Sequence, residues 1–172
     1  MKPFLRIFLS ALKRSSPSVA VFLASCSPLY HLWLLPGSTL QHLAFALGER
    51  QGKESKVPVV QFEVVTCAER ETTVRARPGT RWIDDERPSW RIRAAADSPV
   101  FISRITYGQV PVGFRTLSSA DALAQGSCYF ARFRARAGGG EAVVVINPDG
   151  SLRQLTKDQT AALYDSWRQG PS

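Results

Sequence analysis

The sequence predicts an all-β protein, an antiparallel β-sandwich with an N-terminal signal helix before it and a short C-terminal helix after it. Segments that alternate apolar and polar residues recur about every 8 to 15 residues, as in sandwiches. Turn residues such as Gly138-Gly139-Gly140 separate these segments, and the long helical patterns that parallel sheets require do not occur between them. With 172 residues, 44% of them hydrophobic, the chain can build one core.

We divide the chain into four parts. Residues 1–25 form a signal peptide, residues 26–38 an anchor and a linker or first strand, residues 39–152 the β-sandwich domain, and residues 153–172 a C-terminal helix and tail.

The first 25 residues have the order of a secretory signal. Basic residues lie between Lys2 and Arg14, and an apolar stretch follows from Val19 to Ala24. An uncleaved membrane anchor needs about 20 consecutive apolar residues, and residues 13–16, Lys-Arg-Ser-Ser, interrupt any such run. A cleaved signal peptide is therefore favoured over a membrane-spanning or cytoplasmic segment.

The end of this stretch, Leu23-Ala24-Ser25-Cys26, resembles the Leu-small-small-Cys lipobox of bacterial lipoproteins. The resemblance implies that the Cys26 thiol receives a diacylglyceryl group and that cleavage makes Cys26 the first residue of the mature protein. In that family an aspartate after the cysteine retains the protein in the inner membrane. Ser27 stands there instead, which implies an outer-membrane lipoprotein facing the periplasm. A soluble secretory signal is the alternative.

The net charge of +8 does not indicate a nucleic-acid partner. Half of it comes from Lys2, Arg6, Lys13 and Arg14, and the remaining chain carries 18 basic and 14 acidic residues. The expected partners are the membrane, through the lipid anchor, and an envelope protein or a glycan.

The strands are expected in the following order. Residues 29–35 are a linker or a first strand. Residues 40–47 fit both a helix and a strand, and a strand is favoured because strands and turns recur along the rest of the chain. Further strands are expected at 57–67, 90–94, 101–107, 129–135 and 142–146. One helix closes the chain, because Thr156 and Gln159 form a capping box and Leu163 with Trp167 makes an apolar pair.

Leu123, Gly126 and Tyr129 resemble the Leu-x-Pro-Gly-x-x-Tyr element of fibronectin type III and related sandwiches, in which the tyrosine ties a crossing loop to a strand. The family's proline is Gln125 here. Trp82 and Trp90 lie between Cys67 and Cys128, similar to the Cys, Trp, Cys order of immunoglobulin domains. The resemblance implies an immunoglobulin or fibronectin type III-like sandwich.

Cys67 and Cys128 are the two cysteines that remain if Cys26 is lipidated. An oxidising envelope favours a disulfide between them. Alternatively, each is a small buried apolar residue.

Three segments, "PSWRIRA" (88–94), "ITYGQVPVGF" (105–114) and "INPDGSL" (146–152), follow the lipobox and resemble small uncharacterised bacterial lipoproteins. The resemblance covers most of residues 20–152. It supports the fold and the location and transfers no activity.

Three clusters are candidate sites. Asp84, Asp85 and Glu86 could bind Ca²⁺, although a solvated turn is favoured. The face with Arg132, Arg134 and Arg136 could bind anions, as could Arg91 with Arg93, although arginines also keep an outer face hydrated. The loop 107–114 could bind a peptide or a glycan through Tyr107 and Phe114, unless these rings fix the loop to the core.

The sequence contains no motif for nucleophilic, phosphate-transfer or metal-dependent catalysis, and His31 and His42 lack the spacing of metal ligands. We expect a non-enzymatic structural or interaction protein without a cofactor, anchored by lipid. The alternative is a secreted or periplasmic ligand-binding sandwich that uses the loop 107–114 and the arginine face.

Overall fold

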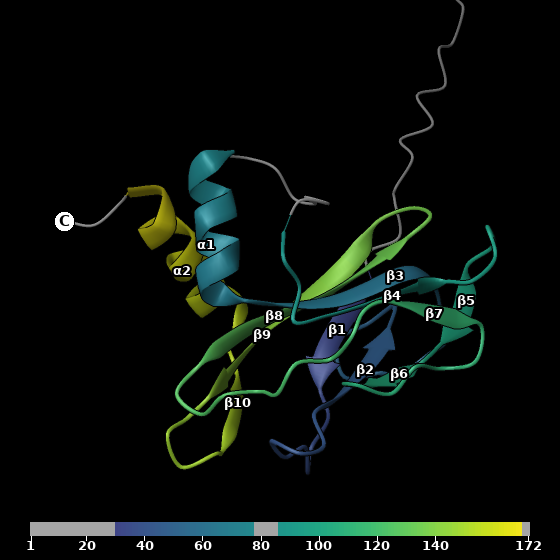
Figure 1. Ribbon diagram of the computed structural model, residues 1–172, viewed down its shortest axis with the longest axis horizontal. Helices are drawn as coiled ribbons and strands as arrows, with labels where there is room; N and C mark the ends of the chain where they lie inside the picture. The colour runs from purple at the N-terminus through teal and green to yellow at the C-terminus, as the bar shows by residue number, and fades with distance from the viewer. Residues whose placement is uncertain (1–29, 78–85, 170–172) are drawn as a thin grey trace, which may run out of the picture.

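The computed structural model describes residues 30–77 and 86–169, in which two antiparallel β-sheets pack face to face (Figure 1). The predicted all-β sandwich is confirmed. The predicted signal peptide lies outside the described residues.

The smaller sheet has the strand order β1-β2-β6. It consists of β1 (His31–Leu34), β2 (Ala44–Gly48) and β6 (Arg104–Thr106). β2 lies in the middle, and all five of its residues are buried. Residues 31–34 are therefore a first strand rather than a linker, and the strand expected at 40–47 begins at Ala44.

The larger sheet has the order β10-β9-β8-β3-β4-β7, and β5 also pairs with β3. Its strands are β3 (Val57–Thr66), β4 (Trp90–Ala94), β5 (Val100–Ile102), β7 (Phe114–Ser118), β8 (Cys128–Ala135), β9 (Gly139–Ile146) and β10 (Leu152–Gln154). β3 is the longest strand and lies between β4 and β8. Its many β-branched residues suit a central strand with a neighbour on each side.

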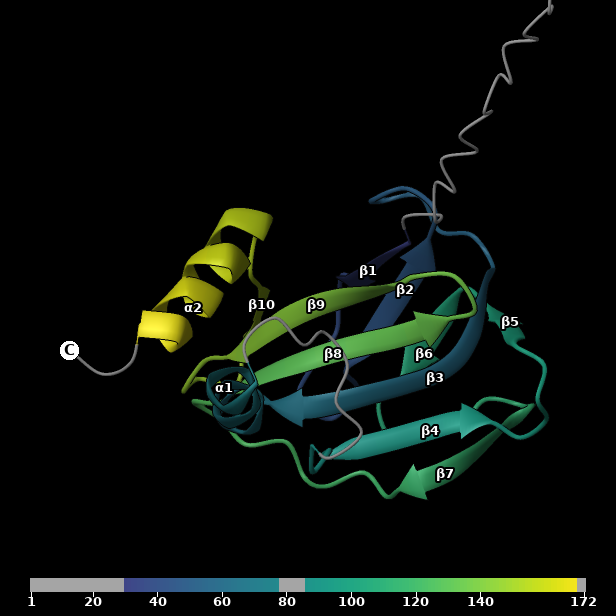
Figure 2. The same ribbon diagram turned by 90° about the horizontal axis from the view of Figure 1, so that it is seen from above.

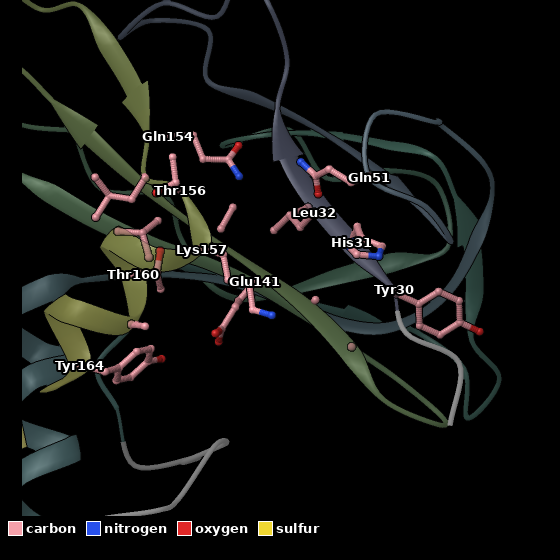
Figure 3. A pocket seen from close by; sticks show the side chains of 16 residues that line it. Tyr30, His31, Leu32, Gln51, Glu141, Gln154, Thr156, Lys157, Thr160 and Tyr164 are labelled. Atoms are coloured by element: carbon pink, nitrogen blue, oxygen red, sulfur yellow. The ribbon is translucent and has the colours of Figure 1, made fainter. Parts of the chain in front are cut away.

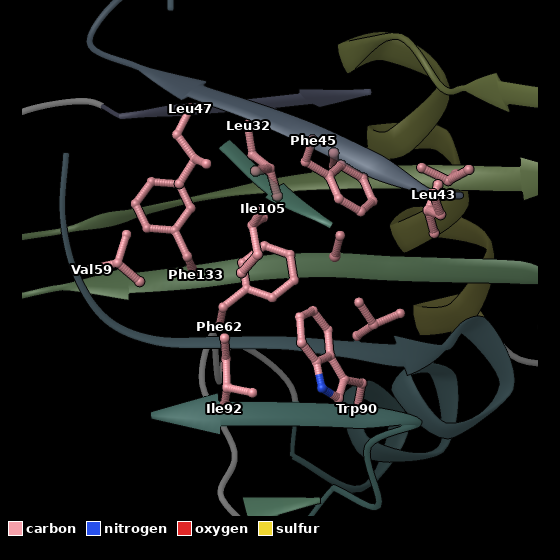
Figure 4. Close-up of a cluster of buried hydrophobic side chains, with 14 of the residues drawn as sticks. Leu32, Leu43, Phe45, Leu47, Val59, Phe62, Trp90, Ile92, Ile105 and Phe133 are labelled. Carbon is pink, nitrogen blue, oxygen red and sulfur yellow. The ribbon is translucent and has the colours of Figure 1, made fainter. Parts of the chain in front are cut away.

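The main core lies between the two sheets (Figure 4). Phe45 of β2 packs against Phe62 of β3 with ring centroids 5.9 Å apart, and Phe62 meets the edge of Trp90 at 5.6 Å. All three rings are at most 1% exposed. These aromatic contacts join the smaller sheet to the larger one.

The predicted C-terminal helix is present as α2 (Lys157–Gln169). The capping box is confirmed, because the Thr156 N–H donates to Gln159 Oε1 at 3.0 Å and the Gln159 N–H donates to Thr156 Oγ1 at 3.3 Å. Trp167 and Tyr164 of α2 pack against Phe130 of β8 on the outer face of the larger sheet. This contact forms a second, smaller core.

A second helix, α1 (Cys67–Ala76), was not predicted. It follows β3 directly and lies beside α2 at one end of the sandwich (Figure 2). The side chain of Thr66 caps it by accepting from the Glu69 N–H at 3.1 Å.

The single strand expected at 101–107 is wrong. The chain forms two short strands, β5 in the larger sheet and β6 in the smaller one, separated by Ser103. The alternation of apolar and polar residues continues through Ser103, so the sequence pattern does not show that the chain passes from the larger sheet to the smaller one there.

β1 of the smaller sheet lies against β9 of the larger one. A Cβ on Gly140 would lie 2.8 Å from Cε1 of Phe133, 3.0 Å from the Tyr30 carbonyl oxygen and 3.2 Å from the Leu32 nitrogen, so a larger residue would force these neighbours to shift. The Leu34 N–H donates to Gln154 Oε1 of β10 at 2.7 Å. The first strand is thus joined to the last two strands of the chain.

Candidate functional site

A groove of about 710 Å³ lies between β1, β9 and the first turns of α2. Figure 3 shows Gln154, Thr156 and Tyr164 on one side of it and Tyr30, His31 and Gln51 on the other, with Glu141 and Lys157 between them. The groove therefore offers hydroxyl, amide and charged groups within one concave surface.

One wall of the groove is a strand edge. β10 pairs with β9 only over residues 144–146, and the Leu155 N–H adds one more bond to the Val143 carbonyl oxygen. Because alternate residues of a strand direct their backbone groups to the same side, the N–H and C=O of Glu141 point to this edge. Among the described residues, no backbone partner lies on that side of Glu141.

Tyr164 connects the groove to the interior. Its burial, and then the nearby carboxylate of Glu141, raise the pKa of the Tyr164 phenol above its usual value. Its hydroxyl accepts from Nε and Nη2 of Arg70, both at 3.4 Å. The Glu141 side chain thus lies close to a hydroxyl that also bonds a buried guanidinium.

Behind Tyr164 lies a cluster of buried charges on the outer face of the larger sheet. The Arg70 Nη1 of α1 donates to Glu86 Oε1 at 2.7 Å, and Arg132 of β8 donates to the other oxygen of Glu86. Arg132 also donates to Glu63 Oε1 at 2.5 Å, and Arg91 donates to Glu63 Oε2 at 2.6 Å. We call these five residues the buried charge cluster.

The buried charge cluster owes its alignment to the strand register. Glu63 of β3 pairs with Arg91 of β4 on one side and with Arg132 of β8 on the other. Arg70 comes from α1, which covers this face of the sheet, and Glu86 is the fifth residue of the buried charge cluster. Burial alone lowers the pKa of Arg70, but Tyr164 and Glu86 outweigh it, so the pKa is raised. Every buried side-chain nitrogen or oxygen in the described ranges has a hydrogen-bond partner, which indicates a structural role for these charges.

The structure corrects the predicted arginine face. Arg132 is 1% exposed and bonded to Glu63 and Glu86, because α1 and the segment at Glu86 cover the sheet there. It cannot form an exposed anion-binding face with its neighbours. Arg134 is half-buried and Arg136 is exposed.

Of the predicted acidic cluster, the structure describes Glu86 alone, and this residue is not solvated. Glu86 is 3% exposed and belongs to the buried charge cluster, whereas Asp84 and Asp85 lie outside the described residues. Within residues 30–77 and 86–169, no three metal-ligating side chains gather.

The rings of the candidate loop 107–114 fix it to the core. The single proton of the Tyr107 hydroxyl is shared between the carbonyl oxygens of Ser89 and Asp121, at 3.1 and 2.8 Å from the hydroxyl oxygen, and the Tyr107 ring packs edge-on against Trp90. Phe114 is 8% exposed and belongs to the core. The exposed apolar groups of the loop are Val110 and Val112 instead.

Cys67 and Cys128 form a disulfide, with their Cα atoms 5.2 Å apart. It joins the first residue of α1 to the first residue of β8, on the side of the smaller core. The Tyr129 hydroxyl accepts from the Ala124 N–H at 2.9 Å, which ties the preceding loop to β8 as the fibronectin-like pattern predicts. The lipobox, Leu23, Ala24, Ser25 and Cys26, lies outside the described residues.

The helices of the described ranges, α1 and α2, do not have the length and apolar character needed to cross a bilayer. Comparisons of the chain with protein-family models, with curated protein sequences and with solved structures find no match.

Proposed function

We propose that the protein is a lipid-anchored, non-enzymatic β-sandwich of the bacterial cell envelope that serves as a structural or interaction module. Its anchor is Cys26, and its location is the periplasmic side of the outer membrane. The proposal rests on the lipobox-like Leu23-Ala24-Ser25-Cys26 together with the Cys67–Cys128 disulfide.

The disulfide is the observation that carries the proposal most directly. Disulfides persist in oxidising compartments such as the periplasm and are rare in the cytosol. Cys67 and Cys128 are already used in this bond, so Cys26 alone retains a thiol for lipidation.

The position of the first strand supports the same interpretation. β1 begins at His31, five residues after Cys26, and is built into the smaller sheet through β2. Cleavage before Cys26 would leave every described strand intact.

The charged residues support a structural role over a catalytic one. The buried charge cluster consists of carboxylates and guanidiniums that bond one another on the outer face of the sheet. Such pairs hold α1 and Glu86 on the sheet, and breaking a buried pair is strongly destabilising.

The test is the intact mass of the protein purified from membranes of a Gram-negative host. We expect a chain that begins at Cys26 and carries acyl chains, and its recovery with the membranes should survive high salt and alkaline wash. Cys26→Ala should retain residues 1–25, whereas the control Ser27→Ala should be processed normally. Ser27→Asp should shift the protein to the inner membrane. An unlipidated wild-type chain that retains residues 1–25 would overturn the proposal.

A second candidate function is ligand binding, as in the predicted periplasmic binding sandwich, and the groove supports it better than the loop 107–114. The open edge at Glu141 can add a strand from an extended peptide through backbone hydrogen bonds. Thermal unfolding with extended peptides would test it. Ala161→Trp should abolish any stabilisation because Ala161 lines the groove, whereas Ala162→Trp on the same helix should not. An equal effect of both variants would contradict a groove site.

A further inference from the structure

The end of the sandwich opposite the helices carries exposed apolar side chains. Phe101 of β5 is 61% exposed and Val112 is 96% exposed. The segments that carry them meet, because a Cβ on Gly113 would stand 3.0 Å from Cγ2 of Val100. Figure 2 shows β5 and the β8–β9 connection at this end, far from α1 and α2.

Two arginines lie at the same end. Phe101 pairs with Pro58 on one side of β3, and Ala135 pairs with Val59 on the other. Arg136 follows Ala135 in the turn to β9, and Arg134 precedes it. Neither arginine makes an ion pair within the part of the chain that the structure describes. We call Phe101, Val112, Arg134 and Arg136 the entry-end surface, because the N-terminal part of the chain enters the fold at this end.

The positive charge continues across the outer face of the larger sheet. Gln61 of β3 pairs with Arg134 on one side and with Arg93 on the other, and Arg93 pairs with Arg115 of β7. Arg93 and Arg115 are exposed, and neither has an ion-pair partner among the described residues. The register therefore places three arginines in one row that ends at the entry-end surface.

The chain also enters the fold at this end. The contact between Gly140 and the Tyr30 carbonyl oxygen places Tyr30 beside the β8–β9 turn. Cys26 precedes Tyr30 by four residues, which span at most about 14 Å when extended. A lipid on Cys26 would therefore hold this end of the sandwich next to the bilayer.

We propose that the entry-end surface docks on the anionic phospholipid bilayer in which Cys26 is anchored. Phe101 and Val112 enter the interfacial region, and Arg134 and Arg136 contact lipid phosphates. Apolar burial and attraction to anionic headgroups add together at such surfaces, and arginine binds phosphate through paired N–H groups. The inference rests on the proposed lipid anchor and adds an orientation to it, with α1 and α2 directed away from the membrane.

The test measures depth at two positions of the lipidated protein in vesicles that contain phosphatidylglycerol. Val112→Cys and the control Ala122→Cys, an exposed position in the loop 119–127 at the helix end, each carry an environment-sensitive dye. Nitroxide-labelled lipids should quench the dye at position 112 several-fold more than the dye at position 122. Equal quenching would overturn the docking surface.

Charge variants test the contribution of the arginines of the entry-end surface separately from that of the lipid anchor. Arg134→Gln with Arg136→Gln should reduce quenching at position 112, whereas Arg75→Gln with Arg168→Gln, the same charge change in the helices, should leave it unchanged. Unchanged quenching in the first pair would also count against the proposal.

Intact mass reports lipidation independently. A lipidated protein with equal quenching at the two positions refutes the surface alone. An unlipidated protein refutes the anchor, and the same quenching comparison then decides whether the surface binds the vesicles. An unlipidated chain that does not bind them overturns both.

Discussion

Glu63 Oε1 accepts from Nε of Arg132 at 2.5 Å, and both side chains are only 2% exposed. Glu63 also accepts from Arg91, so one carboxylate of β3 bonds both neighbouring strands.

Replacing this carboxylate should destabilise the domain severely. Glu63→Gln leaves the buried guanidinium of Arg132 without one of its two carboxylate partners, and such a change costs about 3–5 kcal/mol. The control is Glu54→Gln, which breaks the exposed pair with Arg104 and should cost less than about 1 kcal/mol. Urea unfolding of both variants checks the prediction, and comparable losses would show that the buried pair is not special.

Removing the disulfide should lower the free energy of unfolding. The bond closes a loop with a sequence separation of 61 residues, for which the chain-entropy model gives about 4 kcal/mol. The double variant Cys67→Ala/Cys128→Ala should therefore unfold at lower urea concentration than the parent protein. A reducing agent should destabilise the parent and leave the double variant unchanged. If the parent does not respond to reduction, the bond contributes nothing.

Tyr129 should stabilise the fold through its hydroxyl as well as through its buried ring. Tyr129→Phe removes the acceptor of the Ala124 N–H and keeps the buried ring, so we expect a loss of about 1 kcal/mol. Tyr30→Phe is the control, because the structure shows no hydrogen bond from the Tyr30 hydroxyl within the described residues. Equal midpoints of chemical unfolding for the two variants would argue against a role for this bond.

Alkaline pH should destabilise the fold through Tyr107. Burial, and then the charge of Asp121, raise the pKa of the Tyr107 phenol above its usual value near 10. The unfolded chain then loses this proton at lower pH than the folded one. The stabilisation is complete below about pH 10 and declines as the pH rises further.

Tyr107→Phe should have a lower free energy of unfolding at neutral pH, since the hydrogen bond that the hydroxyl proton shares between the carbonyl oxygens of Ser89 and Asp121 is lost. Its further decline above about pH 10 should be shallower than that of the parent protein. Tyr164, whose pKa is also raised, retains its share of the slope. Identical slopes in parent and variant would exclude Tyr107 as a source.

The sequence predicted the strands best where the apolar residues at every second position all face the core. In β8, residues 129, 131, 133 and 135 point to the core as expected. Arg132 was placed on the correct face, yet its exposure was not predictable, because α1 covers that face and was itself missed. The strand pattern at 101–107 was misleading because period-two alternation is the same whether a chain stays in one sheet or changes to another.

α1 illustrates why the candidate site was harder to predict than the fold. Thr66 and Glu69 have the spacing of a capping signal, but only Arg70 and Val74 of the helix are buried, so no apolar stripe marks it. The ion pair between Arg70 and Glu86 holds α1 on the sheet, and no local sequence pattern connects these two residues. The groove likewise combines β1, β9 and α2, which are distant in sequence.

The bond between the Leu34 N–H and the Gln154 side chain spans 120 residues and has a consequence for the order of folding. β1 reaches its final place only when β9 and β10 are present, that is, after nearly the whole chain has been synthesised. β1 and β2 can pair with each other before then, but the contacts of β1 with β9 and β10 must wait for these last two strands. If the protein is exported as proposed, the contacts that join the first strand to the last two form only after the final strand has crossed the membrane.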